Sequence, residues 1–328
     1  MRSFDYSRAT AVGEAVATVA ADPAAAFLAG GTTQVDLMKD GVLAPARLVD
    51  ITRLPLRYVH HGQDAVHVGA LTSMEELAAD PVVAQRLPVM REALLLGASV
   101  QLRNMATMGG NLLQRTRCRY FRDLTCPCNK REPGTGCAAL QGVHRMHAVL
   151  GTSEHCIATH ASDVAVALVA LDAVVHVQGP EGERAIPLTD FYLLPREEPN
   201  RENVLRHGEL ITSIEVPLLP ANARSVYLKV RDRTSYEFAL SSAAVALVVR
   251  DGVIREARVG LGGVATVPWR AGGAEDVLRG ARAGAEVFQS AAQAAVQGAI
   301  PHRDNAFKIE LAKRTVVRAL QTVSDKAS

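Results

Sequence analysis

Apolar positions at the start of the chain switch between helical and strand-like spacing. Small apolar residues recur at helical spacing from Ala11 to Ala20, and the apolar run Ala25 to Gly30 leads into a pair of glycines. A helical pattern follows from Thr33 to Asp40, and another apolar run ends at Ile51. Short apolar runs bounded by turn residues are typical of buried strands. The pattern predicts a small β/α unit over residues 1–53.

A new pattern begins near Leu54. Ala65 to Ala70 alternates between apolar and polar residues as a half-buried strand does, and helical spacing follows. Thr72 and Ser73 each stand three residues before a glutamate, which is the spacing of a capping box at a helix start. Pro81 favours another helix start, because proline is accepted in the first turn of a helix. We therefore expect a strand followed by several helices.

Strands and helices share the rest of the chain. Residues 161–179 predict a helix followed by a strand, and residues 209–220 predict a strand that ends at a proline. Beyond that proline, residues 224–263 predict paired strands with Asp251-Gly252 as a hairpin turn. Helical spacing then continues from Ala271 onward. The last third of the chain is therefore expected to be a β-sheet followed by packed helices.

Composition and charge narrow the function classes. Of the 328 residues, 48% are hydrophobic, which allows a sizeable core, and the net charge of +2 arises from interspersed charges. A nucleic-acid-binding protein would carry a concentrated basic surface, so no nucleic-acid partner is expected. No apolar run approaches the roughly 20 residues of a membrane span, and the N-terminus lacks a secretory pattern. We expect a cytoplasmic protein without membrane insertion, or a periplasmic one if it is exported with a signal-bearing partner.

Two glycine-containing segments carry the first candidate chemistry. FLAGGTTQVD spans Phe27 to Asp36, and NMATMGGNLLQ spans Asn104 to Gln114. Glycines let main-chain N–H groups approach an anion without a Cβ atom in the way. Either segment alone is more often an ordinary turn, and neither is the G-x-G-x-x-G of a nicotinamide-binding fold. Together, two such turns beside threonines predict a clasp around a pyrophosphate.

All five cysteines lie in one glycine- and proline-containing segment, at Cys118, Cys126, Cys128, Cys137 and Cys156. Soft metals and iron–sulfur clusters use thiolate ligands, whereas packing gives no reason to gather every thiol in one place. No tight C-x-x-C pair is present, so neither a zinc finger nor a ferredoxin motif is predicted. The alternatives are disulfides, which an odd number of cysteines disfavours, and a basic loop with idle thiols. Since only Pro127 separates Cys126 from Cys128, one of these two is expected to be a spare.

Basic side chains and histidines surround the cysteines. Cations would stabilise a cluster, because four thiolate ligands give it a net negative charge. The cations of the segment are Arg115, Arg117, Arg119, Arg122, Lys130 and Arg131. Its histidines, which are more often supporting or surface residues than metal ligands, are His144, His147, His155 and His160. Further on, Lys229 at a predicted strand edge could meet a flavin or a phosphate, although a surface lysine is the commoner case.

These motifs resemble those of a known family, the FAD-binding (medium) subunits of molybdenum hydroxylases of the xanthine dehydrogenase type. AGGTTQVDL and TMGGNLLQ resemble the two flavin-clasping motifs of that family, and the Ser162–Asp163 pair and the SIEVP strand also fit. The resemblance covers nearly the whole chain. QRTRCRYFRD and CNKREPGTGC resemble an insertion that binds a [4Fe–4S] cluster in the subgroup of periplasmic aldehyde oxidoreductases. A comparable insertion occurs in 4-hydroxybenzoyl-CoA reductase.

The resemblance implies a role for each matching residue. The FAD diphosphate would be wrapped by main-chain donors of Ala29, Gly30, Gly31, Thr32, Thr33 and Gln34, with Thr107, Gly110 and Asn111 completing the clasp. Asp163 would bind sugar or ribityl hydroxyls with Ser162 beside it, Ile211 would pack near the ring, and Lys229 would contact the flavin head. The cluster ligands would be Cys118, Cys128, Cys137 and Cys156, and Cys126 falls where no ligand is expected.

The resemblance also implies the fold class. It is α+β, with a two-part FAD-binding domain followed by a C-terminal domain of antiparallel β-sheet plus helices. The expected boundaries are residues 1–220 for the first domain, with subdomains of about 1–53 and 54–220 and the cluster loop at 115–157, and residues 221–328 for the second.

Function follows from the same resemblance. The chain would be the FAD and [4Fe–4S] electron-transfer subunit of a molybdenum-containing aldehyde oxidoreductase, which converts an aldehyde to a carboxylic acid. A large partner subunit would hold the molybdenum cofactor, and a small one the [2Fe–2S] centres that supply electrons, which leave to an acceptor such as ferredoxin. No residue of this chain need act as an acid or base. A xanthine dehydrogenase-like or hydroxybenzoyl-CoA reductase-like enzyme, a stand-alone flavin oxidase and a zinc-stabilised scaffold remain open.

Overall fold

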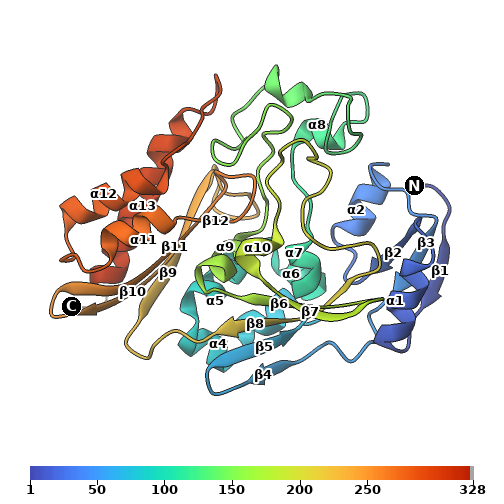
Figure 1. Ribbon diagram of the computed structural model, residues 1–328, viewed down its shortest axis with the longest axis horizontal. Helices are drawn as coiled ribbons and strands as arrows, with labels where there is room; N and C mark the ends of the chain where they lie inside the picture. Colours follow the sequence, from blue (N-terminus) through green and yellow to red (C-terminus); the bar gives the residue numbers. More distant parts are fainter. Residues whose placement is uncertain (326–328) are drawn as a thin grey trace.

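Three β-sheets follow one another across the molecule in the computed structural model, which describes residues 1–325 (Figure 1). The N-terminal sheet lies at the right of the view, a five-stranded sheet in the middle, and a third sheet with its covering helices at the left. The cysteine-containing segment, drawn in green with α8, lies above the middle part. The mixture of sheets and helices confirms the predicted α+β class.

The N-terminal unit is a parallel sheet with strand order β1-β3-β2. Its elements are β1 (Asp5–Arg8), α1 (Val12–Ala20), β2 (Ala25–Leu28), α2 (Gln34–Lys39) and β3 (Arg47–Asp50). The helical spacing of the apolar residues in α1 is explained by its buried face, which carries Val16 and Val19 into the local core. The sequence pattern missed β1, because all its side chains are exposed and its partner β3 is distant in the sequence.

The middle sheet is antiparallel, with strand order β4-β5-β8-β6-β7. Its strands are β4 (Val59–His61), β5 (Ala65–Gly69), β6 (Val174–Gly179), β7 (Gly182–Pro187) and β8 (Leu210–Pro217). The helices of this part are α3 (Met74–Ala79), α4 (Pro81–Arg86), α5 (Pro88–Leu96), α6 (Val100–Met105), α7 (Met108–Leu112), α9 (Asp163–Ala170) and α10 (Leu188–Phe191). Only α8 (Arg119–Arg122) and the 3₁₀ turn Ala138–Leu140 are regular within the cysteine segment.

Side-chain caps decide where the first helices of the middle part begin. Ser73 forms a complete capping box with Glu76, so this pair, rather than the one at Thr72, starts α3. Asp80 accepts hydrogen bonds from two main-chain N–H groups and starts α4 at Pro81. Because α3 packs against α6, these caps also hold the segment that leads to the second pair of glycines.

Helix α9 joins the middle and C-terminal parts. All its residues are buried, and it packs against α5 as well as against three strands of the C-terminal sheet. Gly260 and Gly262 allow this approach, because Cβ atoms on them would lie 2.7 Å from the Val166 carbonyl oxygen and 2.6 Å from a Val166 methyl carbon. The helix begins at Asp163 with Ser162 as its N-cap, so the tight packing fixes both residues.

The C-terminal part is an antiparallel sheet covered by helices. Its strands, in the order β12-β11-β10-β9, are β9 (Arg224–Val230), β10 (Ser241–Arg250), β11 (Val253–Gly262) and β12 (Trp269–Arg270). Its helices are α11 (Gly272–Leu278), α12 (Ala285–Ala295) and α13 (Phe307–Asp325). The predicted hairpin turn is confirmed, since Asp251 and Gly252 have φ angles of 53° and 72°.

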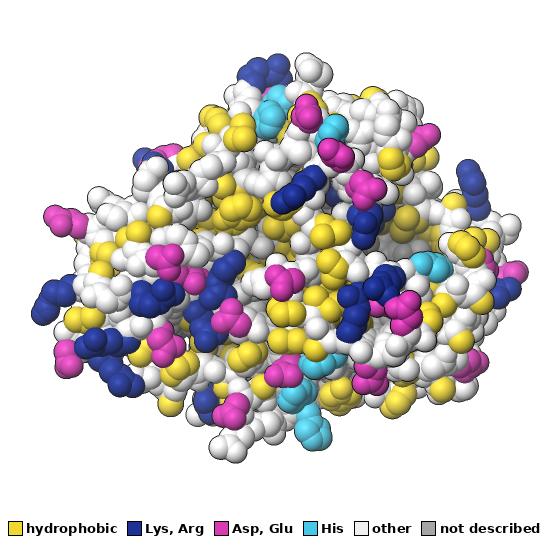
Figure 2. Space-filling view, viewed as in Figure 1, with side chains coloured by type: hydrophobic (Ala, Val, Ile, Leu, Met, Phe, Trp, Pro, Cys, Tyr) yellow, Lys and Arg dark blue, Asp and Glu magenta, His cyan; other side chains and the backbone are white. Residues whose placement is uncertain are grey.

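The surface carries charges of both signs. On the face shown in Figure 2, lysines and arginines are interspersed with aspartates and glutamates, so this face has no extended basic area. Among the helices of residues 1–325, none combines the length and apolar character that a membrane crossing requires.

Candidate flavin site and cysteine loop

Three adjoining cavities form one cleft. The clasp cavity, about 180 Å³, lies between the two glycine segments; the central cavity, about 480 Å³, follows it; the thiol-side cavity, about 630 Å³, borders the cysteine loop. Thr33 and Gly110 line both the clasp cavity and the central cavity. Arg117 and Phe238 line both the central and the thiol-side cavity. Every residue that the sequence analysis assigned to flavin binding lines one of the three.

The two glycine segments meet directly. A Cβ atom on Gly30 would lie 1.8 Å from the main-chain oxygen of Met105, so only glycine permits this approach. Gly31 has φ +72°, in the left-handed region that glycine adopts without strain. In the second segment, the Thr107 side chain caps α7 by accepting a hydrogen bond from the N–H of Gly110. Both segments therefore present tight turns to the clasp cavity.

Main-chain donors remain free at the first turn. Within residues 1–325, the N–H groups of Gly30, Gly31, Thr32 and Thr33 have no hydrogen-bond acceptor. Free donors in a glycine turn form a concave site for an anion, of which a phosphate is the common example. The neighbouring residues of the cavity wall are firmly held, because the Ser162 hydroxyl donates to Asn111 Oδ1 at 2.5 Å.

A buried ion pair closes the far end of the central cavity. Lys229 Nζ lies 2.7 Å from Asp163 Oδ2, and the Tyr227 hydroxyl donates to Asp163 Oδ1 at 2.7 Å. Burial raises the pKa of Asp163, while Lys229 opposes the rise. The Lys229 side chain is 1% exposed, so it is no surface lysine although β9 is an edge strand. Sequence analysis expected both residues at the flavin but did not foresee that they pair.

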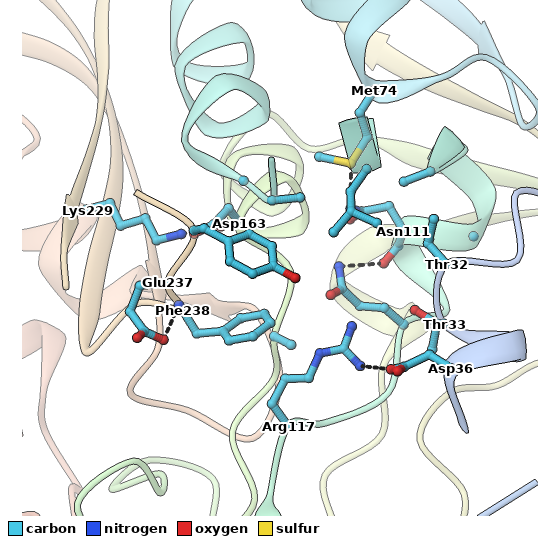
Figure 3. Close-up of a pocket in the computed structure, with 18 of the residues that line it drawn as sticks. Thr32, Thr33, Asp36, Met74, Asn111, Arg117, Asp163, Lys229, Glu237 and Phe238 are labelled. Carbon is cyan, nitrogen blue, oxygen red and sulfur yellow. Dashed lines mark hydrogen bonds and ion pairs between the residues drawn. The ribbon is translucent and has the colours of Figure 1, made fainter. Parts of the chain in front are cut away.

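Several cleft residues were not predicted. Arg117, Asp36, Glu237 and Phe238 line the central cavity together with the expected residues (Figure 3). Arg117 and Asp36 approach one another below the cavity, and Phe238 comes from the loop between β9 and β10 on the opposite side. These contacts join residues far apart in the chain, so no local pattern could have revealed them.

Hydrogen bonds and ion pairs, rather than an apolar core, order the cysteine loop (residues 115–157). Arg115 and Lys130 both pair with Glu202, at 2.5 and 2.9 Å. Arg131 donates to the main-chain oxygen of Phe121 at 2.7 Å and to that of Cys126. Its apolar anchors are the fully buried Phe121 ring, which packs near Leu37 and Cys128, and, near its C-terminal end, Val149 and Leu150, which join the core of the C-terminal part. Between these anchors the loop is held chiefly by polar contacts.

Four thiols of this loop lie close enough to influence one another. Burial raises the pKa of Cys118 to about 12, and the thiols of Cys156 and Cys128 add to the rise. Burial likewise raises the pKa of Cys137 and of Cys156, and Cys128 again adds to both. Coulombic influence falls with distance, so these side chains lie near one another, and the main chains of Cys128 and Cys137 pair in an antiparallel bridge. They are the four cysteines that the resemblance matched to cluster ligands, whereas Cys126 lines the thiol-side cavity, as Cys118 also does.

The described part of the chain, residues 1–325, shows no preformed group of metal-binding side chains. Within residues 1–325, no three His, Cys, Asp or Glu side chains gather as a group that could hold an ion, and all five cysteines are free thiols. The zinc-stabilised scaffold and the disulfide alternatives therefore find no support. Of the histidines, His147 lies closest to the thiols, with Nε2 3.2 Å from Cys118 Sγ.

A cleft with two converging glycine turns defines a protein that binds a nucleotide cofactor, and the chain matches known families over most of its length. Residues 2–219 match the FAD binding domain in molybdopterin dehydrogenase, and residues 226–323 match the CO dehydrogenase flavoprotein C-terminal domain. The chain belongs to the molybdopterin dehydrogenase family of FAD-binding subunits.

Individual relatives support the same conclusion. The aldehyde oxidoreductase FAD-binding subunit PaoB of Escherichia coli (strain K12) is 46% identical over 98% of this chain and 98% of its own length. The carbon monoxide dehydrogenase medium chain of Hydrogenophaga pseudoflava is 28% identical over 97% and 96%. A solved structure of carbon monoxide dehydrogenase from that organism, lacking the Mo-pyranopterin moiety, has a TM-score of 0.80 at 27% identity, covering 100% of this chain and 99% of that one.

Proposed function

We propose that this chain is the FAD subunit of a molybdenum-containing aldehyde oxidoreductase and that its cysteine loop holds a [4Fe–4S] cluster. The observation that carries the flavin role is the convergence of two glycine turns on one cleft, with unpaired N–H donors at the first of them. The similarity to an aldehyde oxidoreductase subunit over nearly the whole chain supports aldehydes as the substrate class. The protein's task is then to place and tune redox cofactors, not to supply an acid or base.

The residues around the cleft suit an extended dinucleotide. The N–H groups of the first turn, from Ala29 to Gln34, would hold the diphosphate, with Thr107, Gly110 and Asn111 across from them. Ile211 lines the clasp cavity, which would receive the adjoining part of the nucleotide. Asp163, oriented by Lys229 and placed in the first turn of α9 after the N-cap Ser162, faces the central cavity, where it can accept hydrogen bonds from the flavin portion. FAD supplies one- and two-electron chemistry when bound, and these side chains hold and orient it.

The four converging cysteines suit a cluster better than a single ion. Ligands of one ion stand about 4 Å apart, because each metal–sulfur bond is about 2.3 Å long. A [4Fe–4S] cluster binds each thiolate through a different iron atom, so it needs converging thiols at wider separations. Cys118, Cys128, Cys137 and Cys156 influence one another's pKa without forming a single-ion group, which fits the wider arrangement. Lys130, whose charge lowers the pKa of Cys156, would offset the negative charge of bound thiolates.

The chain would work within a complex. A large subunit would hold the molybdenum cofactor and a small subunit the [2Fe–2S] clusters that deliver electrons to the cleft. The medium chains of carbon monoxide dehydrogenase, which share the fold, support this arrangement. An external acceptor such as a ferredoxin would then take the electrons. We place the complex in the cytoplasm unless a partner carries an export signal.

Purification of the chain with its partner subunits tests the proposal. The complex should contain one FAD per chain and about four iron atoms beyond those of the [2Fe–2S] clusters, and it should oxidise aldehydes. FAD without the additional iron would refute the cluster but not the flavin role. A complex without flavin would refute both, and aldehyde turnover by the isolated chain would favour a stand-alone oxidase.

A further inference from the structure

Arg117 stands where the cysteine loop meets the flavin cleft. It directly precedes Cys118 in the chain, and its side chain lines both the central and the thiol-side cavity. We propose that Arg117 binds an anionic oxygen of FAD and thereby ties the cysteine loop to the flavin. This inference rests on the proposed flavin role, because FAD is taken as the ligand.

The hydrogen-bonding capacity of Arg117 is unused. Its Nη1 atom is buried without a hydrogen-bond partner, and the nearest carboxylate oxygen, Asp36 Oδ2, is 3.9 Å away. That distance is too long for a hydrogen bond, and Arg122 already donates to the same oxygen at 2.6 Å. The other cations that line the central cavity have carboxylate partners: Lys229 with Asp163 at 2.7 Å, Arg122 with Asp36 at 2.6 Å, and Arg233 with Glu237 at 3.5 Å.

The environment of Arg117 favours an incoming anion. The Arg117 side chain is 25% exposed, and it shares Asp36 with a second cation, Arg122. Removing a guanidinium from water without filling its donors is unfavourable, and a charge-assisted hydrogen bond to an oxygen anion offsets that loss. Arg117, whose ion pair is the longest of the four, thus has more to gain from an anionic ligand than the other cations beside it.

The side chain is also held in position. The Arg117 guanidinium carbon lies 5.4 Å from the centroid of the Phe238 ring, a cation–π distance. In Figure 3 the guanidinium lies at the lower edge of the central cavity, facing Asp36 and Thr33 on one side and Phe238 on the other. Two oxygens of FAD match this donor: those of the diphosphate, and the ring oxygen that becomes anionic when the flavin is reduced. Both share the same chemistry toward a guanidinium.

Arg117 would make the two cofactor sites interdependent. The next residue, Cys118, donates its main-chain N–H to the Thr116 hydroxyl at 3.2 Å, so the backbone around Arg117 is fixed within the loop. If the Arg117 side chain binds FAD, the position of the flavin depends on how well the loop is ordered. We therefore expect loss of the Arg117 contact to weaken flavin binding while the four thiols stay in place.

The test compares Arg117→Gln with Arg255→Gln in the full chain, purified with any partners and stripped of FAD. Arg255 is a good control, because it is exposed on β11 and lines none of the three cavities. If Arg117 contacts the diphosphate, titration with FAD, followed by flavin fluorescence, should show a dissociation constant about 10- to 100-fold higher for Arg117→Gln, as expected for a lost charged hydrogen bond. Arg255→Gln should bind FAD like the wild type. Thermal unfolding of both FAD-free variants checks that each is folded.

Two further readouts identify the oxygen. If Arg117 binds the diphosphate, Arg117→Gln weakens FAD binding but leaves riboflavin binding unchanged. If it binds the reduced ring, affinity for oxidised FAD is unchanged and the midpoint potential falls, by about 30 mV for each tenfold loss in a two-electron couple. Unchanged FAD affinity together with an unchanged potential would overturn the inference. Failure of the wild type to bind FAD would instead refute the proposed flavin role.

Discussion

The clasp cavity and the cysteine loop are ordered by different means. Around the clasp cavity, regular elements bring two main-chain turns so close that Gly30 has no room for a side chain. In the cysteine loop, only α8 and one 3₁₀ turn are regular, and polar contacts such as those of Glu202 supply the order. Backbone packed within a core is stable by itself, whereas a loop with few apolar contacts opens more readily. The difference teaches that main-chain packing preforms the clasp cavity, whereas the loop depends on its ion pairs and hydrogen bonds.

The largest expected effect is the loss of iron from the cysteine loop while FAD stays bound in the cleft. Cys137→Ser should abolish the cluster absorbance and remove about four iron atoms per chain, because one of four thiolate ligands is lost. FAD content should stay close to one per chain, since Cys137 lines none of the three cavities of the cleft. Visible absorbance and iron analysis of the purified complex measure both.

Cys126→Ser is the matched control, because the two cysteines share one loop and only Cys137 belongs to the converging four. This variant should keep its iron. If Cys126→Ser lost the iron and Cys137→Ser kept it, the ligand assignment would be wrong. The conclusion that the cleft and the loop are ordered by different means would still hold.

The next effect concerns the cleft. Gly30→Ala places a Cβ atom against the Met105 carbonyl, so the two turns must separate. We expect FAD binding to be lost and the free energy of unfolding to fall by about 1–3 kcal/mol, as overpacking does. Gly13→Ala is the control, since a Cβ atom there meets nothing within 4 Å and Gly13 lies in α1. It should bind FAD normally and be slightly more stable, because alanine favours a helix.

A smaller effect probes the polar order of the loop. Glu202→Gln leaves the guanidinium of Arg115 and the buried ammonium of Lys130 without their shared carboxylate. We expect a loss of about 1–3 kcal/mol in the stability of the loop. Faster iron loss to a chelator would measure it, with FAD retained. Glu198→Gln, which removes an exposed ion pair with Arg201, should release iron at the wild-type rate.

Local sequence patterns predicted the parts of the molecule that are set by local chemistry. The paired glycines, the cap at Ser73, the Asp251-Gly252 turn and the helix that begins at Asp163 each follow from neighbouring residues. The resemblance to a family then supplied roles that no pattern could give. The capping box shows the limit of prediction from local patterns. Thr72 and Ser73 both fit the sequence pattern, and only the backbone conformation of the structure shows that Ser73 is the N-cap.

Contacts between distant residues escaped prediction. Lys229 and Asp163 were each expected at the flavin, but their ion pair spans 66 residues of sequence and two parts of the fold. Arg117 was noted only as one cation of the loop, because its position against Phe238 depends on how the C-terminal part packs. Such pairings are tertiary contacts, which residue spacing along one segment does not encode.

The smallest effect lies at the junction of the two regions. His160 stands between the cysteine loop and α9, where its Nδ1 accepts the N–H of Ser162 at 3.3 Å and its ring packs on Tyr192. Burial lowers the pKa of His160 from 6.5 to about 4. A histidine that stays neutral in the folded state but charges in the unfolded state near pH 6.5 favours unfolding as the pH falls. Its contribution is therefore complete above pH 6.5 and is lost progressively between pH 6.5 and 4.

His160→Asn tests this loss of stability at low pH. The Asn oxygen can still accept a hydrogen bond from the Ser162 N–H, but the side chain cannot become charged. Between pH 7.5 and 5, the midpoint of thermal unfolding should fall by about 2–4 °C less in the variant than in the wild type. His61→Asn, at an exposed site paired with Asp80, is the control and should follow the wild-type curve more closely. If the unfolding midpoints of His160→Asn and the wild type fell equally with pH, His160 would not be held neutral in the folded protein. The junction would then be as accessible to water as the cysteine loop.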